Sequence, residues 1–448
     1  MNYLELASDV TKKAIKKGAN ESEVFLEIST EFQVRTRKGE IEILKQSQKS
    51  GLGLRVFVDN RLGFSYTSDF NFENLETLME KTIVLAGHSS SDEFFGLPEK
   101  DALYNENIKD LKIYDPRVDT IDTETKIELA KRAEEACFSE SSRIKNSEGA
   151  NFISEKNTII IANSISDPIS FDSTYFYLSA EPIAENANEK RIGVFWDSKR
   201  FFSDLDSPEN IGKKAALRAE RMLGAKRIKS QKVPVILENI ISNRFLYALA
   251  SAVNGDNVYK KASFLASMLN KKVSTDLINL NDDGTISKGL NSRPFDDEGV
   301  LTRRKKIIDK GVLTSFLYDT YTATKAKTTS TGNASRGYDD TPHIGILNFY
   351  MENGETTLEQ MIKGIKSGLL ITDLMGFGIN WVTGDFSQMA EGIWIENGEL
   401  TYPVDEVTLA GTLFDLLAKV EQVGDDLVFR GPVACPSLKI SEMVIGGK

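Results

Sequence analysis

The chain has 448 residues, enough for two or three domains with a large core. Its 66 acidic and 55 basic side chains give a net charge of −11, which argues against a sequence-independent grip on nucleic acid. No run approaches the roughly 20 apolar residues of a membrane span, and the two cysteines, Cys137 and Cys435, lie too far apart in sequence to suggest a disulfide framework. The first ten residues lack the apolar core of a signal peptide. We therefore expect a cytoplasmic protein that binds neither membranes nor nucleic acid directly.

The first 88 residues predict a helix, a set of strands and a second helix. Apolar residues at helical spacing over 4–15 end at Gly18. A change to alternation then predicts antiparallel strands joined by short turns. The last apolar pattern in this region is helical, over Asn74 to Gly87. The predicted strands cover 23–29, 32–36, 41–46, 51–58 and 62–66.

Residues 89–116 are polar and rich in turn residues, which predicts a linker or long surface connection. The same order of elements then recurs over 117–224. A helix is predicted from Asp122, as N-cap, to Phe138, and another from Pro208 to Leu223. Strands are predicted between them, at 158–162, 171–180 and 191–196. No residue-level repeat relates the two regions, so duplication stays only a possibility.

Residues 229–448 predict a strand-rich C-terminal domain of mixed type. A buried strand over 233–237 precedes an amphipathic helix over 240–253, which stops at Asn254-Gly255-Asp256. Short turns divide the remainder into strands, interrupted by predicted helices over 357–368 and 412–420. Because strands and helices mix without βαβ regularity, the predicted fold class is α+β.

Few residues are suited to metal or nucleophilic chemistry. The chain has two histidines, His88 and His343, so it cannot build a three-histidine zinc site. His343 follows the acidic Asp339 and Asp340 and is either functional or a plain loop histidine. Cys435 is either a small buried residue at the start of a strand or a reactive thiol. The small polar run from Gly332 to Gly337 either admits a ligand close to the backbone or forms a flexible loop.

Several segments of the third region resemble the signature stretches of the TldD/PmbA family, once called modulators of DNA gyrase. Their order and spacing also match the family, and together they are a specific signal. The segments are Pro294–Val300, Gly311–Leu313, Leu317–Asp319, Ser330–Ala334, Thr383–Ser387 and Gly392–Glu399, preceded by Leu223–Lys226 and Asn254–Asp256.

The resemblance implies a proteolytic system in which one type of subunit binds zinc through His-Glu-x-x-x-His on a helix that ends in Gly-Asp. Anchored on Gly255-Asp256, the three motif positions here are Leu246, Tyr247 and Ser251, none of which is a zinc ligand. The chain thus resembles the PmbA (TldE) type, with no cofactor of its own and zinc expected only in a sister subunit. Cys435 is near the family's C-terminal cysteine in order, but it directly precedes the final strand.

Three functions of different classes stay open. The first is the metal-free subunit of a cytosolic peptidase that acts on unfolded peptides with a TldD-like sister. The second is a non-catalytic peptide-binding homodimer, and the third is a protein that modulates gyrase by interaction. We expect the chain not to be a monomer, with the third region forming both the partner surface and the substrate cavity. The substrate or interface candidates are Asn333, His343, Trp381, Gly384, Asp385, Phe386 and Cys435.

Overall fold

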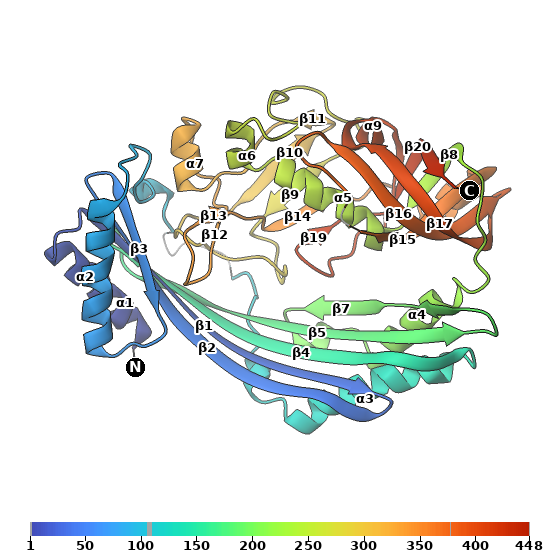
Figure 1. Ribbon diagram of the computed structural model, residues 1–448, viewed down its shortest axis with the longest axis horizontal. Helices are drawn as coiled ribbons and strands as arrows, with labels where there is room; N and C mark the ends of the chain where they lie inside the picture. Colours follow the sequence, from blue (N-terminus) through green and yellow to red (C-terminus); the bar gives the residue numbers. More distant parts are fainter. Residues whose placement is uncertain (1, 105–109, 377, 448) are drawn as a thin grey trace.

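The computed structural model describes residues 2–104, 110–376 and 378–447. The fold is α+β, as predicted, and a long curved antiparallel sheet forms its base (Figure 1). The strand order is β3-β2-β1-β4-β5-β6, with β7 also paired to β5. The sheet strands are β1 (Glu21–Arg37), β2 (Glu40–Val58), β3 (Arg61–Thr67), β4 (Ile144–Asn163), β5 (Ile169–Glu185), β6 (Lys190–Ile192) and β7 (Phe195–Lys199).

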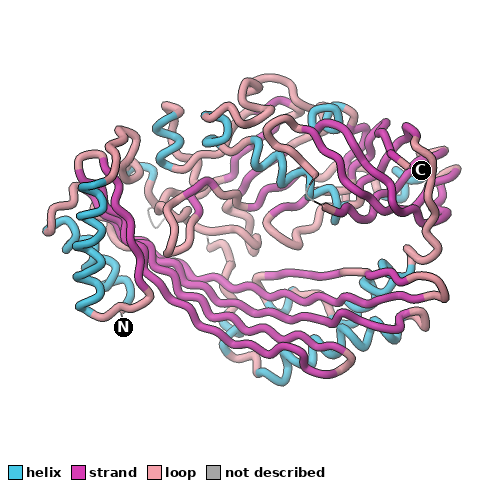
Figure 2. Tube along the Cα trace, in the orientation of Figure 1, coloured by secondary structure: helices cyan, strands magenta, loops and turns pink. Residues whose placement is uncertain are grey.

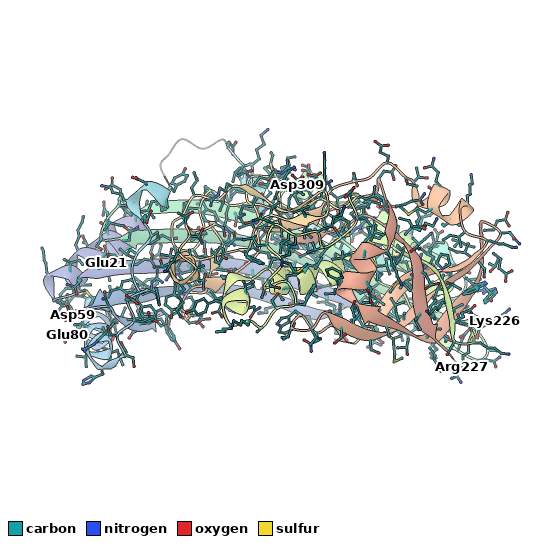
Figure 3. The ribbon with its side chains drawn as sticks, turned by 90° about the horizontal axis from the view of Figure 1, so that it is seen from above. Glu21, Asp59, Glu80, Lys226, Arg227 and Asp309 are labelled. Carbon is teal, nitrogen blue, oxygen red and sulfur yellow. The ribbon has the colours of Figure 1, made fainter. Side chains whose placement is uncertain are left out.

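The sheet is continuous through the first two predicted regions, because β1 pairs with β4 along most of its length. The magenta strands of Figure 2 run side by side through most of the molecule. Seen from above, the acidic Asp59 and Glu80 lie at one end, and the basic Lys226 and Arg227 lie at the other (Figure 3). The long strands therefore set the long axis. The division into separate domains at 88 and 117 stays a prediction.

Two pairs of helices cover the sheet on the side away from the C-terminal region (Figure 1). The helices α1 (Tyr3–Lys16) and α2 (Phe72–His88) close a core with Val24, Leu54 and Ile160 at one end. At the other end α3 (Thr123–Glu140) and α4 (Pro208–Glu220) pack on Val34, Phe152 and Leu178. The predicted N-cap is confirmed, since the Asp122 side chain accepts a hydrogen bond from the backbone N–H of Thr125.

The predicted strand over 191–196 is wrong in detail, because it is interrupted at Gly193 and divided into β6 and β7. A Cβ there would lie 2.3 Å from the carbonyl oxygen of Ala215 on α4. The close approach of the helix therefore requires glycine. The strands predicted over 158–162 and 171–180 are much longer than expected, and they form β4 and β5.

The connection over 89–116 is not wholly a surface segment. It contains the 3-10 turn η1 (Lys100–Ala102) and leads into η2 (Pro116–Asp119). Leu103, Leu111 and Ile113 are buried, and the N–H of Tyr104 donates to the carbonyl of Gly299 at 2.9 Å. The connection therefore packs against the C-terminal region. Its residues 105–109 lie outside the described part of the chain.

The C-terminal region faces the concave side of the sheet (Figure 1) and contains a small barrel. Its strands follow the order β17-β16-β15-β8-β20, and β17 also pairs with β20, which closes the ring. The edge strand β18 extends it. The strands are β8 (Gln231–Leu237), β15 (Ser367–Met375), β16 (Asp385–Glu396), β17 (Glu399–Thr412), β18 (Val420–Val423) and β20 (Leu438–Gly446).

A second sheet has the order β11-β10-β9-β14-β19, and β12 pairs with β13. These strands are β9 (Leu280–Asp283), β10 (Arg304–Asp309), β11 (Val312–Leu313), β12 (Ala334–Ser335), β13 (His343–Ile344), β14 (Asn348–Met351) and β19 (Val433–Ala434). The helices are α5 (Asn239–Ala252), α6 (Gly255–Tyr259), α7 (Thr320–Lys325), α8 (Leu358–Lys363) and α9 (Leu413–Ala418).

The helix predicted over 357–368 is wrong in its second half. A capping box between Thr357 and Gln360 starts α8 as expected. The helix ends before Gly364, and β15 begins at Ser367. Residues 369–371 pair with β8 inside the barrel, so tertiary pairing overrides a weak helical pattern.

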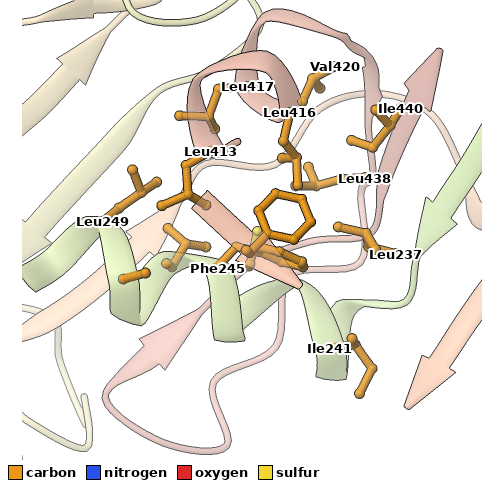
Figure 4. Close-up of a cluster of buried hydrophobic side chains, with 14 of the residues drawn as sticks. Leu237, Ile241, Phe245, Leu249, Leu413, Leu416, Leu417, Val420, Leu438 and Ile440 are labelled. Atoms are coloured by element: carbon orange, nitrogen blue, oxygen red, sulfur yellow. The ribbon is translucent and has the colours of Figure 1, made fainter. Parts of the chain in front are cut away.

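Helix α5 carries the largest apolar core (Figure 4). Ile241, Phe245 and Leu249 repeat at a spacing of four and belong to one buried cluster with Leu413 and Leu416 of α9. Within the described residues, no helix is long and apolar enough to cross a membrane.

Candidate functional site

A cavity of about 500 Å³ opens along the face of α5 that is not packed into the core. The helix contributes Arg244, Tyr247, Ala248 and Ser251, which repeat at the spacing of one helical face. The opposite wall comes from the connection between β15 and β16 and from β16 itself, and consists of Gly376, Ile379, Trp381 and Gln388. The lining is mainly apolar, with a few polar groups, as is typical of a site for a small organic group.

Two sets of contacts fix the position of α5. Its apolar face is held in the core of Figure 4. Its first turn follows Glu238, which accepts hydrogen bonds from Arg218 at 2.8 Å and from Arg221 at 3.1 Å. Burial opposes ionisation of Glu238, but the two guanidinium groups together hold the pKa of this carboxyl below its usual value. A rigid helix thus presents the cavity face.

A second cavity of about 430 Å³ continues the first along α5. The two cavities share Arg244 and Tyr247. The middle region contributes Val194 and Trp196 to the second cavity. Since the lining residues Ile240 and Ser251 are eleven positions apart on the helix, the groove follows α5 for about 16 Å. That length matches about five residues of an extended peptide.

The far end of the groove is charged. It includes Thr372, Asp373 and Glu391 beside the first turns of α5. Burial raises the pKa of Glu391, against the effect of Arg191. An ion pair of 3.8 Å joins the guanidinium of Arg244 to the carboxylate of Asp373, and both side chains are exposed. The groove therefore changes from apolar to charged along its length.

The three positions predicted to match the family's zinc helix have separate roles here. Leu246 is buried in the core at 1% exposure, whereas Tyr247 is 47% exposed and lines both cavities. Ser251 lines the first cavity, and its hydroxyl donates to the carbonyl of Tyr247 at 3.2 Å. An aliphatic side chain, a phenol and a hydroxyl do not make a zinc donor set. Among the described residues there is also no cluster of three or more histidine, cysteine or carboxylate side chains placed to hold a metal.

Of the candidates predicted near β16, Trp381 lines the cavity, whereas Gly384, Asp385 and Phe386 do not. Trp381 lines the cavity and is 44% exposed. Phe386 is buried and meets Phe245 of α5 edge to face, with 5.3 Å between the ring centroids. Gly384 has a φ of +82° and packs against Phe264, while Asp385 is exposed. Phe377, in the connection between β15 and β16, lies outside the described residues.

Three other predicted candidates lie away from this groove. Asn333 is buried, and its amide donates to Asp282 at 2.8 Å and accepts from Lys305 at 2.8 Å. Cys435 is also buried, and burial raises the pKa of its thiol to about 12, so the thiolate is not available at neutral pH. His343 is exposed in the short strand β13. The structure does not bring these residues together with Trp381.

The signature stretches at 294–300 and 330–334 instead build a buried polar junction between the sheet and the C-terminal region. Arg55 of β2 lies 3.0 Å from both Glu23 of β1 and Glu298. Arg336 also pairs with Glu23, at 2.5 Å. Asp296 accepts backbone N–H bonds from Glu298, Val300 and Ala334, at 3.0, 2.9 and 2.9 Å. These ion pairs and hydrogen bonds join the two parts, although Glu23 Oε2, Arg55 Nε and Arg336 Nε have no hydrogen-bond partner among the described residues.

Sequence reasoning missed four residues that line the first cavity, Arg244, Ala248, Ile379 and Gln388. The first two share a helical face with Tyr247, so the spacing along α5 was a usable signal. Gln388 is 4% exposed, and its Oε1 is buried without a hydrogen-bond partner among the described residues. Its place in β16 gave no signal, because the strand alternates in the same way with or without a cavity beside it.

Comparison with known proteins finds matches along nearly the whole chain. Family models match residues 22–86 as PmbA/TldA metallopeptidase domain 1, 116–223 as the central domain and 230–447 as the C-terminal domain. "Metalloprotease PmbA" of Escherichia coli O157:H7 is 34% identical, covering 99% of this chain and 94% of that protein. A "Metalloprotease TldD homolog" of Buchnera aphidicola is 25% identical, over 89% of this chain and 86% of its own.

A solved structure from Bacteroides thetaiotaomicron, described as a candidate modulator of DNA gyrase, superimposes with a TM-score of 0.91. It is 30% identical and covers 99% of this chain and 98% of its own. The family models together span the three regions of the molecule, and the relatives match it almost from end to end. The chain is therefore a member of the PmbA/TldD family of metallopeptidase homologues.

Proposed function

We propose that this chain is the PmbA (TldE)-type, metal-free subunit of a cytosolic peptidase that acts on unfolded peptides. Its role is to hold an extended stretch of substrate along α5, while a TldD-like sister subunit supplies the zinc and the hydrolytic step. The observation that carries the proposal is the groove itself. At the family's zinc-helix positions the chain has an open, mainly apolar cavity with Tyr247 and Ser251 on its wall, in place of a donor set.

The composition of the groove supports peptide as the ligand. An apolar pocket beside Trp381 suits a large side chain, and the charged end near Asp373 suits a polar one. The sister subunit is the family partner that the resemblance implies, and the chain is more similar to PmbA than to TldD among the relatives described above.

Hydrolysis of a disordered protein substrate tests this function. We expect no cleavage by the purified chain, and cleavage once a His-Glu-x-x-x-His sister is added, abolished by a chelator. After extensive dialysis, elemental analysis should find no stoichiometric zinc in the chain alone. Robust chelator-insensitive cleavage by the chain alone would contradict the proposal, as would one tightly held zinc per chain.

Peptide binding can be measured without the sister. Fluorescence anisotropy of a labelled, unstructured peptide should report binding to the chain, weakened by Tyr247→Ala. Phe72→Ala is a matched control, since Phe72 is a 68% exposed aromatic residue on α2. Equal affinities for wild type and both variants would place the peptide elsewhere.

A further inference from the structure

A third cavity, of about 330 Å³, lies between the concave face of the sheet and the C-terminal region. Strands β1, β4 and β5 form its floor, and residues within 290–297 and 335–336 cover it. Within the described residues it shares no lining residue with the two cavities along α5. Its lining is mainly polar and carries charges of both signs, so it differs in chemistry as well as in place.

A buried cation, Arg200, lines one side of this cavity and is 9% exposed. Its guanidinium donates to the backbone carbonyls of Thr174, Gly289 and Leu290, at 2.9, 3.1 and 2.5 Å. These bonds fix the guanidinium without neutralising it, and no carboxylate of the described residues lies within ion-pair distance of it. Of the five N–H donors of a guanidinium, two are left, one on each terminal nitrogen. Two such donors match the two oxygens of a carboxylate.

A second guanidinium adds to the positive charge on this side. Arg293 lines the same cavity and lies 2.9 Å from Asp297. Burial, together with the charge of Arg293, lowers the pKa of Arg200 to about 10. Keeping two cations close together away from water costs free energy, which an anion placed between them would offset.

Two carboxylates line the cavity from its floor. Glu27 lies on β1 and Glu155 on β4, and neither forms an ion pair with another described residue. Burial raises the pKa of Glu27, and the charges of Asp297 and Glu155 raise it further. Asn157 also lines the cavity, and its Oδ1 is buried without a hydrogen-bond partner among the described residues. This side of the cavity therefore favours a cation that donates hydrogen bonds.

The sheet sets the distance between the two charged sides. Glu155 pairs with Tyr175 of β5. Arg200 directly follows β7, and the register of β7 with β5 brings it opposite the same tyrosine. Two strand spacings then separate the Cα atoms of Glu155 and Arg200 by roughly 10 Å. The ends of a peptide of two or three residues are about 7–10 Å apart, whereas a free amino acid carries both charges on one carbon.

We propose that this cavity binds a peptide of two or three residues with free termini, as a zwitterion. The peptide carboxylate lies against Arg200, close to Arg293, and the ammonium group lies between Glu27 and Glu155. A polar cavity holds either water or a polar ligand. Unpaired charges of opposite sign on its two sides favour a ligand that carries both charges.

Peptides of this length are what hydrolysis of a longer peptide releases, and that connection rests on the proposed function. The binding itself requires neither the α5 groove nor a sister subunit. Between the charged sides, Ile159 and Phe171 pair across β4 and β5 and line the floor. An aliphatic side chain suits this apolar part, so alanyl-leucine is the probe.

Isothermal titration calorimetry of the full chain with alanyl-leucine tests the site. We expect one binding site per chain. N-acetylalanyl-leucine and alanyl-leucine amide should each bind roughly tenfold more weakly, because each lacks one of the two charges. Alanyl-alanyl-leucine should bind within about threefold of the dipeptide. Free leucine should bind at least about tenfold more weakly, since it does not reach both sides.

Matched variants assign the two ends of the peptide. Glu27→Gln should weaken binding of alanyl-leucine roughly tenfold and hardly change that of the acetylated form, which has no ammonium group. Arg200→Lys keeps the charge but loses the paired donors, and should weaken binding of the free dipeptide more than that of its amide. Glu128→Gln, an exposed carboxylate on α3, is the control and should change neither. If Arg200→Lys does not fold, Glu27→Gln still decides, because that side chain is only half-buried.

Several results would overturn the proposal. One is the absence of binding at millimolar alanyl-leucine, and another is equal affinity for the free and the blocked dipeptides. Binding that Glu27→Gln leaves unchanged and Tyr247→Ala weakens would place the dipeptide in the α5 groove, which removes this site but not the proposed function. Dipeptide binding as expected, with no cleavage of a disordered substrate once the sister is present, would remove the proposed function and leave this site intact.

Discussion

The buried junction around Glu298 and the groove along α5 are both rich in polar groups, but they use them in opposite ways. At the junction, Arg55, Glu23 and Arg336 are almost fully buried, and each charge has an oppositely charged partner. In the groove, Arg244 and Tyr247 are exposed, and Gln388 Oε1 has no partner among the described residues. The difference is one of exposure: the junction joins two parts of the fold through buried ion pairs, whereas the groove leaves side chains open to solvent.

The largest effect of a substitution on the free energy of unfolding is expected at the junction. Arg55→Met removes the cation shared by Glu23 and Glu298 and leaves Glu298 without a cationic partner. We expect a loss of about 3–5 kcal/mol in the free energy of unfolding, measured by urea denaturation. Arg132→Met is the control, because its pair with Glu209 is exposed, and it should cost less than about 1 kcal/mol. Equal, small losses would show that the junction does not hold the two parts together.

The junction should also make stability depend on pH. Burial, aided by the charge of Glu298, raises the pKa of Asp296 to about 8, despite three opposing backbone hydrogen bonds. The folded state then binds a proton that the unfolded state has lost, so stability should fall as pH rises from about 4 to 8 and level off above that.

Asp296→Asn should remove this contribution. The unfolding free energy of wild type should fall more steeply between pH 5 and 8 than that of the variant, by at most about 1.4 kcal/mol per pH unit. The slopes are compared, because the amide also disturbs the backbone bonds and lowers stability at every pH. Parallel slopes would mean that Asp296 is ionised in the folded state throughout this range.

In the groove we expect the opposite of the junction: a substitution should weaken peptide binding and hardly change the free energy of unfolding. Trp381→Ala should weaken binding of an unstructured peptide roughly tenfold, because exposed aromatic residues in a cavity contribute much of the affinity. Its effect on the free energy of unfolding should stay within about 1 kcal/mol, since the side chain is already 44% exposed. A large loss of stability without loss of affinity would make Trp381 a supporting residue.

The smallest effect of a substitution on peptide binding is expected at the cysteines. Cys137 and Cys435 are buried, and burial raises the pKa of each thiol to about 12. Neither should react with a thiol reagent until urea unfolds the protein, when both should react. Cys435→Ala should leave peptide affinity unchanged. Fast labelling of Cys435 in the folded protein would reopen its role at the site.

Much of the local structure could be predicted from the sequence. The helices α1 to α5 follow from apolar spacing and from caps such as Asp122, since both signals lie within a few neighbouring residues. The order of the family segments led to the family, and the positions predicted to match the zinc helix are Leu246, Tyr247 and Ser251. Two of these three line the cavity.

The sequence by itself determined the helices α1 to α5, the α+β class and the family, because each depends on local pattern or order along the chain. Only the tertiary structure decided that one sheet runs through two predicted regions, that Asn333 and Cys435 are buried, and that Trp381 faces Tyr247 across a groove. These facts depend on contacts between residues far apart in the chain. Glu23 and Glu298 are 275 positions apart, yet both contact Arg55. No local pattern encodes such a pairing, because its energy comes from burial that exists only once the sheet and the C-terminal region have closed on each other.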